Sequence, residues 1–281
     1  MGTDGGSGGG VATGGGLATG GGSVTGGGSA TGGGTATGGG TATGGGSAAG
    51  GAGGGLGGVT TTGVSIIVEP SDNATALKNA ILNARTSVHM TMYLLSSTPI
   101  INALISQKQA GHEVKVLLNQ TFTAGMGSNS SVFTQLQASG IDVKWAPSTF
   151  TLTHEKCVII DGTTAWVMTM NATTSAPTGN REYLAVDTFA PDVQEAEAIF
   201  QSDFGVPTPI TGDLLVSPMT SRPRLNALIA SATRTIDIEA EELSDYQIVT
   251  GLQSARMRNV TVHVVLSDTT PTSAYSRFLL V

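Results

Sequence analysis

The chain has little charge, few aromatic residues and a single cysteine. Charged residues make up 12% of its 281 positions and aromatic residues 5%. Cys157 has no second cysteine to pair with, which excludes a framework of internal disulfides. No apolar run approaches the roughly 18 residues that a membrane-spanning helix needs, so the sequence predicts no transmembrane segment.

Basic residues are also scarce. Lys and Arg together number 13 against 20 Asp and Glu, which gives a net charge of −7. No run or stripe of Lys and Arg is present. Proteins that follow a nucleic acid duplex take most of their affinity from cations that neutralise phosphates, so this composition disfavours that class.

The first 62 residues are rich in glycine. Triplets of Gly alternate with Val-Ala-Thr, Leu-Ala-Thr, Ser-Val-Thr and similar triplets, at a six-residue period. Such a tract buries too little apolar surface to offset its chain entropy, so we interpret residues 1–62 as a disordered, low-complexity tether. The strict period also leaves a stacked glycine-rich solenoid open as an alternative.

The N-terminus gives two opposite indications of location. No signal peptide is present, which predicts a cytoplasmic protein if Met1 is the true start. Position six is Gly6, so the pattern for N-myristoylation is not met. The tether, however, resembles the segment that follows the lipidated cysteine of bacterial surface lipoproteins. On that resemblance we expect an extracytoplasmic protein, secreted or held in the cell envelope, and truncated at its N-terminus.

The rest of the chain contains an internal repeat. A shift of 148 positions (216 − 68) aligns Val68 with Val216 and Pro70 with Pro218 without a gap. Each copy has the periodicity of helix, strand, helix and strand, over 76–83, 87–94, 100–110 and 113–119 and again over 224–231, 235–240, 248–257 and 260–267. We predict two tandem α/β/α units with a mixed or mostly parallel sheet, at residues 63–206 and 207–281.

A constellation of polar residues lies in the first unit. His154 and Lys156 precede an apolar run, Asp161-Gly162 forms a turn, and 165–168 read as the returning strand of a hairpin. On an extended strand, residues two apart share a face. His154 and Lys156 therefore point the same way, as do Thr169 and Asn171, and one face carries a nucleophile or base beside a cation.

This spacing resembles the signature of the phospholipase D superfamily, which is His-x-Lys, then Asp, then Gly-Ser-x-Asn. The chain departs from it with Met168 in place of Gly and Thr169 in place of Ser. Thr169 keeps a hydroxyl that can bond a phosphate oxygen, whereas Met168 adds bulk near the pocket floor. Asn180-Arg181-Glu182 resembles the Asn-x-Glu element of the family.

The resemblance implies a phosphodiesterase. His154 would attack phosphorus to form a phosphohistidine, while Lys156 and the polar groups of Thr169 and Asn171 hold the phosphate oxygens. Asp161 would orient and support the site, and Glu182 would hydrogen-bond a motif histidine and fix its tautomer. A second histidine would protonate the leaving alcohol. The scheme requires no metal and no other cofactor.

In this family two halves pack face to face, and each gives one His-Lys motif to a central site. The repeat would place the second motif near position 302 (154 + 148), beyond Val281. We therefore expect the second unit to be incomplete, in either a truncated chain or a single-motif protein that forms a homodimer. His89, His112 and His263 are interpreted as structural or solvated residues rather than substitutes.

The acidic composition favours a phospholipid headgroup over DNA or RNA as the substrate, with peripheral contact to a membrane. Three alternatives stay open. The chain could be an endonuclease of the same superfamily that acts as a dimer, a non-catalytic protein that binds a phosphorylated partner, or an adhesin-like surface protein whose glycine-rich tract is the functional part.

Overall fold

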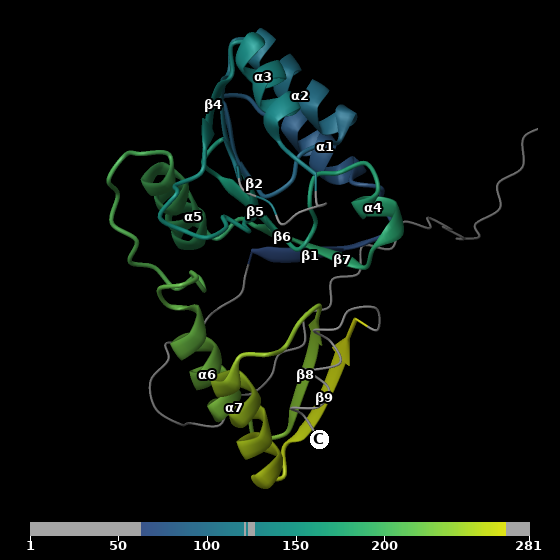
Figure 1. Ribbon diagram of the computed structural model, residues 1–281, viewed down its shortest axis with the longest axis vertical. Coiled ribbons are helices and arrows are strands. Elements are labelled where there is room, and N and C mark those ends of the chain that lie inside the picture. Colours follow the sequence, from purple (N-terminus) through teal and green to yellow (C-terminus); the bar gives the residue numbers. More distant parts are fainter. Residues whose placement is uncertain (1–62, 121, 123–126, 268–281) are drawn as a thin grey trace, which may run out of the picture. The chain divides into compact units, whose positions relative to one another are not determined.

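The computed structural model describes residues 63–120, 122 and 127–267 (Figure 1). The predicted tether at residues 1–62 lies outside the described residues. In the described part, no helix combines the length and the apolar character needed to cross a bilayer.

The first unit is built on a seven-stranded sheet. Its strands are β1 (Val64–Glu69), β2 (Ser87–Met92), β3 (Glu113–Leu118), β4 (Asp142–Trp145), β5 (Lys156–Ile160), β6 (Thr164–Met168) and β7 (Glu182–Asp187). Its helices are α1 (Thr75–Leu82), α2 (Thr98–Gln109), α3 (Ser130–Ala138), α4 (Ala176–Gly179) and α5 (Ala190–Asp203). The predicted alternation of strands and helices is therefore confirmed.

The sheet is mixed, with the strand order β1-β7-β6-β5-β2-β3-β4. Neighbouring strands are parallel from β2 through β4 and antiparallel elsewhere. Strands β5 and β6 form the predicted hairpin, with Cys157 opposite Val167. Asp161 and Gly162 make its turn with positive φ angles of 55° and 61°. Gly adopts such angles without strain and Asp does so more readily than most residues.

Two apolar layers cover the two faces of this sheet. On one face Met90, Val158 and Trp166 pack with residues of α1, α2 and α3. On the other face Cys157 and Ile159 pack against α5. Successive strand residues alternate between the layers because side chains of a strand point to opposite faces. The face under α5 is therefore also the one to which His89 and Lys115 contribute polar side chains.

The second unit repeats part of the first. It contains α6 (Ser221–Ser231), β8 (Thr235–Ala240), α7 (Tyr246–Met257) and β9 (Thr261–Leu266). Adding 148 to the bounds of β2, α2 and β3 gives the bounds of β8, α7 and β9 (87 + 148 = 235, 98 + 148 = 246, 113 + 148 = 261). The parallel pairing has the same register, with Ser87 opposite Glu113 and Thr235 opposite Thr261. The repeat found in the sequence is therefore a repeat of the backbone.

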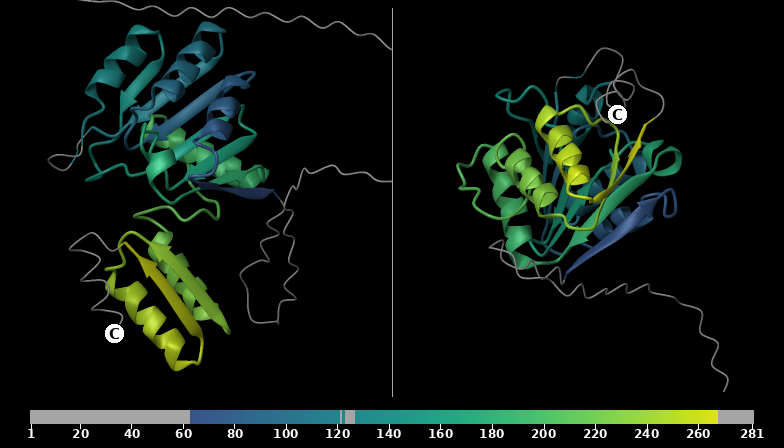
Figure 2. Two further views of the ribbon diagram at one scale, coloured as in Figure 1. Left: turned by 90° about the vertical axis from the view of Figure 1, so that its right-hand side faces the viewer. Right: turned by 90° about the horizontal axis from the view of Figure 1, so that it is seen from below.

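Helices α6 and α7 lie side by side on one face of the β8–β9 pair (Figures 1 and 2). Ile236, Ile238 and Val264 pack against them with buried residues such as Leu252. On the other face of the two strands, side chains are exposed at Asp237, Glu239, His263 and Val265, among others. The corresponding face of the first unit carries α5.

Candidate functional site

His154 lies just before β5, not within it. The strand begins at Lys156, so the prediction of a strand that includes His154 was wrong by two residues. The Glu155 carbonyl still accepts a hydrogen bond from the Tyr93 N–H at 3.0 Å. The Thr153 N–H instead donates to the Asn119 side-chain oxygen at 3.0 Å. Before β5 the Asn119 side chain therefore replaces a neighbouring strand as hydrogen-bond partner, and His154 lies outside the regular sheet.

The His154 imidazole is exposed and stands edge-on to the Tyr93 ring, with the ring centroids 4.4 Å apart. Desolvation by the atoms around it, and then the charge of the Lys156 ammonium, lower the pKa of His154 below its usual value of 6.5. The ring is therefore mainly neutral at neutral pH. A neutral imidazole carries the lone pair that a nucleophile needs.

Lys156 is only 6% exposed. Its Nζ donates to the His154 carbonyl oxygen at 2.7 Å and lies 5.0 Å from the centroid of the Tyr93 ring. Burial lowers the pKa of Lys156 to about 8, although the carboxylates of Glu182 and Glu241 act in the opposite direction. The amine is thus still largely protonated at neutral pH, and its charge acts in a partly dehydrated setting where Coulomb interactions are stronger.

Glu182 begins β7 and is 8% exposed. Its carboxylate accepts hydrogen bonds from the Thr169 hydroxyl at 2.5 Å and from the Asn180 amide at 2.9 Å. Among the described residues its hydrogen bonds thus go to a hydroxyl and an amide, whereas the sequence analysis expected a histidine partner. The Thr169 hydroxyl is already committed to Glu182, so a bond from it to a phosphate oxygen would replace that contact.

Asn171 does not stand free beside His154. Its side-chain oxygen accepts the N–H of Leu94, two residues after the end of β2, at 3.2 Å. Asn129 bonds this segment with both ends of its side-chain amide. Its oxygen accepts the Leu95 N–H at 3.0 Å, and its NH2 group donates to the carbonyl of Tyr93 at 2.8 Å. The two amides hold the chain where it leaves β2, next to the proposed nucleophile. No sequence pattern marks Asn129, which has the place of an ordinary residue before a helix.

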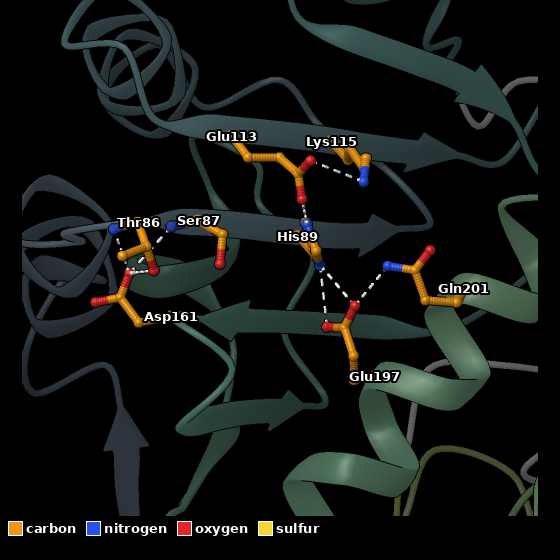
Figure 3. A network of polar contacts seen from close by, with 8 residues as sticks. All are labelled: Thr86, Ser87, His89, Glu113, Lys115, Asp161, Glu197 and Gln201. Carbon is orange, nitrogen blue, oxygen red and sulfur yellow. Dashed lines mark hydrogen bonds and ion pairs between the residues drawn. The ribbon is translucent and has the colours of Figure 1, made fainter.

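Asp161 lies at the opposite end of β5 from His154. Its carboxylate accepts the backbone N–H groups of Arg85, Thr86 and Ser87 at 2.8 to 3.1 Å, and also the Thr86 hydroxyl. Figure 3 shows the contacts with Thr86 and Ser87. Burial alone would raise the pKa of Asp161, but these hydrogen bonds lower it below 3.8. The structure does not bring Asp161 to the other site residues, and its contacts fit the supporting role that the resemblance implied.

Met168 is buried in the same apolar layer as Trp166 and Leu184. By strand alternation it shares a sheet face with Lys156, which is two residues before Val158 of the same layer. The bulk of Met168 is therefore buried on the face to which Lys156 belongs. Tyr93, which the sequence analysis did not single out, is the residue that contacts both His154 and Lys156. Its position at the end of a predicted strand was the one available signal.

Comparisons with solved structures found matches at low sequence identity. A phospholipase D family member, Nuc, from Salmonella typhimurium is 22% identical, with 53% of this chain and 99% of that chain covered and a TM-score of 0.46. NucT from Helicobacter pylori is 19% identical, with coverages of 50% and 94% and a TM-score of 0.43. Polyphosphate kinase from Porphyromonas gingivalis is 17% identical, with coverages of 74% and 39% and a TM-score of 0.57, which is a likeness of fold.

A search of curated protein sequences found no match. Residues 77–204, however, match the family model described as cardiolipin synthase, PLD-like domain. That range contains β2 to β7, α5 and all the predicted site residues from His154 to Glu182. The match identifies residues 77–204 as a phospholipase D-like domain.

Proposed function

We propose that this chain is a phosphodiesterase that works through a covalent intermediate on His154. The observation that carries the proposal is the neutral His154 imidazole beside the partly dehydrated Lys156 ammonium, whose Nζ bonds the His154 carbonyl at 2.7 Å. A ring nitrogen attacks phosphorus, and the bond from phosphorus to the leaving alcohol breaks. Lys156 neutralises charge on the non-bridging oxygens as the transition state forms. Water then displaces the histidine and releases a phosphomonoester.

The leaving alkoxide needs a proton, and in the scheme it comes from a second histidine. Among the described residues no histidine other than His154 contacts Lys156 or Glu182. We therefore propose that a second copy of the chain supplies this group in a homodimer. Activity per chain should then rise with concentration as the dimer forms, and analytical ultracentrifugation over the same range should report the association. Full activity of a strict monomer would contradict the dimer.

The substrate class that we propose is a phospholipid, cleaved at its headgroup. The net charge of −7 makes attraction to polyanionic DNA or RNA weak. Two apolar side chains, Phe150 and Leu152, are 38% and 40% exposed just before His154. In that position they can contact the acyl region of a bilayer while the headgroup phosphate meets the histidine, which supports peripheral membrane contact.

The test is hydrolysis without added metal. Phosphatidylcholine vesicles, an oligonucleotide and bis(p-nitrophenyl) phosphate would be offered to the wild-type chain, to His154→Ala and to a matched control. His263→Ala is that control, because His263 is an exposed histidine whose ring bonds to Asp237 on the neighbouring strand. We expect the His154 variant to lose turnover and the His263 variant to keep it.

Each other outcome would redirect the proposal. Unchanged turnover by His154→Ala removes that residue from the mechanism. Cleavage of the oligonucleotide in preference to the vesicles identifies a nuclease of the same superfamily. Saturable binding of a phosphodiester without hydrolysis favours a non-catalytic phosphate-binding protein.

A further inference from the structure

Tyr93, the residue directly after β2, contacts both of the residues to which we assign the chemistry. Its ring meets the edge of the His154 imidazole at a centroid distance of 4.4 Å, and the Lys156 Nζ lies 5.0 Å from its centroid. Tyr93 is 3% exposed although His154 beside it is exposed. The ring thus forms the buried wall of the site behind the histidine and the lysine.

The backbone on either side of this ring is fixed by hydrogen bonds. The Tyr93 N–H donates to the Glu155 carbonyl at 3.0 Å, which ties it to the chain between His154 and Lys156. The Tyr93 carbonyl accepts from the amide of Asn129 at 2.8 Å, and Asn129 is itself 1% exposed. These bonds fix the backbone at Tyr93, and its side chain is buried at 3% exposure, so packing around the ring restricts its movement relative to the histidine.

The Lys156 ammonium is oriented by the same neighbours. An ammonium has three N–H donors. One is directed to the His154 carbonyl, and the Tyr93 ring occupies a second side of the group. A cation over an aromatic face is attracted by the ring, which also keeps water from that side. Among the described residues the His154 carbonyl is the one hydrogen-bond acceptor found for this ammonium, so a further donor can serve an oxygen of a bound phosphate.

We propose that Tyr93 is a positioning residue of this site, whose ring sets the orientation of the His154 imidazole and excludes water from one side of the Lys156 ammonium. The inference deepens the proposed function and rests on it for its catalytic meaning. The arrangement of the three side chains stands on its own, because it can be measured without turnover.

Loss of the Tyr93 ring should change the pKa of Lys156. Desolvation is the largest cause of the lowered pKa of Lys156, and the carboxylates of Glu182 and Glu241 oppose it. Desolvation and then the Lys156 charge lower the pKa of His154, which also lies next to this ring. Replacing the ring with an aliphatic side chain lets water reach the ammonium while all of these groups stay in place. The pKa of Lys156 should then rise toward its ordinary value of 10.5.

The experiment compares Tyr93→Phe, which keeps the ring, with Tyr93→Leu, which removes it. Turnover of bis(p-nitrophenyl) phosphate would be followed against pH. We expect Tyr93→Phe to resemble the wild type. For Tyr93→Leu we expect kcat to fall by about 10- to 100-fold, since small misplacements of reacting groups cost this much. KM should change little, and the alkaline limb of the kcat profile should move to higher pH.

A second measurement needs no catalysis. The side-chain amine of Lys156 would be titrated by NMR in the wild type and both variants, with its signal assigned from Lys156→Arg. A higher Lys156 pKa in Tyr93→Leu, but not in Tyr93→Phe, supports the inference. An unchanged pKa together with an unchanged kcat overturns it, and so does an equal loss in both variants, because that would implicate the hydroxyl rather than the ring.

The two measurements separate this inference from the proposed function. If the wild type hydrolyses no phosphodiester but the Lys156 pKa responds to loss of the ring, the proposed function fails and the arrangement of the three residues is upheld. If the wild type is active but neither the kcat profile nor the Lys156 pKa changes in Tyr93→Leu, the proposed function stands and the positioning role of Tyr93 is rejected. Tyr93→Met fills the buried volume without a ring and would replace the leucine variant if that variant did not fold.

Discussion

The Nδ1 atom of His89 lies 2.9 Å from a carboxylate oxygen of Glu197, which joins strand β2 to helix α5 across the sheet face (Figure 3). On the other side of the ring, Nε2 lies 2.8 Å from the carboxylate of Glu113. An ionised carboxylate only accepts hydrogen bonds, so both ring nitrogens must donate. The geometry therefore requires an imidazolium. Stacking of this ring on Phe200, at a centroid distance of 4.8 Å, completes its attachment to α5.

We predict that His89 stabilises the fold in a pH-dependent way. Burial alone would lower its pKa, but Glu197 and then Glu113 raise it above 6.5. A raised pKa in the folded state means that the stabilisation is complete below 6.5 and is lost as the pH rises through the folded value. His89→Gln should therefore lower the free energy of unfolding by on the order of 1–2 kcal/mol in mildly acidic solution, and by less at alkaline pH.

Urea denaturation of the wild type and the variant across this range measures the difference. His263→Gln is the matched control, because His263 and its partner Asp237 have side chains that are 67% and 71% exposed. Exposed pairs contribute little, so the control should show almost no change. A stability difference that grew with rising pH would contradict a charged His89.

Asp161 should stabilise the fold and take no direct part in the reaction. Its carboxylate satisfies the N–H groups of Arg85, Thr86 and Ser87, and an alanine would leave them without that acceptor. We expect Asp161→Ala to reduce the free energy of unfolding by about 1–3 kcal/mol. The kcat of the fraction that stays folded should be close to that of the wild type. Thermal unfolding and active-site titration would be measured together, and normal stability with a large loss of kcat would assign Asp161 to the reaction instead.

Glu182 should shift the pH dependence in the direction opposite to Tyr93. Its charge raises the pKa of Lys156, which stands at about 8. Glu182→Gln keeps the shape of the side chain and removes the charge, so the pKa of Lys156 should fall and the alkaline limb of activity should move to lower pH. Glu242→Gln, at an exposed position, is the control. An alkaline limb that stayed in place would mean that Lys156 does not set it.

Asn129 should be intolerant of substitution. It is 1% exposed and its amide donates to the carbonyls of Tyr93 and Asn119 at 2.8 and 3.0 Å. Asn129→Ala removes these donors and should cost about 2–4 kcal/mol of stability. Asn129→Asp should be worse at neutral pH, because it sets a carboxylate against carbonyl oxygens. Chemical denaturation would rank the variants, with Asn79→Ala on the exposed side of α1 as a control that should be nearly neutral.

The elements that the sequence predicted well are those with a local signal. The helices and strands common to both copies (α1, β2, α2 and β3, and α6, β8, α7 and β9) follow from apolar periodicity, and the Asp161-Gly162 turn predicted the β5–β6 hairpin. No ranges were predicted for α3, β4, α4, β7 and α5. Strand β1 was not predicted, because its pairing with β7 joins Val64 to Asp187 and no short window of sequence reports such a contact. The same holds for the site. The spacing indicated His154 and Lys156, but Tyr93 and Asn129 join them only through the folded sheet.

The equal register of the two repeats has one more consequence. His89 faces Lys115 across β2 and β3, and the positions 148 residues later are Asp237 and His263, which face each other across β8 and β9. In the second copy the histidine finds its carboxylate at 2.7 Å on the adjacent strand. In the first copy the position directly opposite carries a second cation, so the two ring nitrogens of His89 find their carboxylates at other positions: Glu113 at the start of β3 and Glu197 on α5. The exchange of one acid–base pair thus links the first copy to the helix that covers it, while in the second copy the pair lies within two strands.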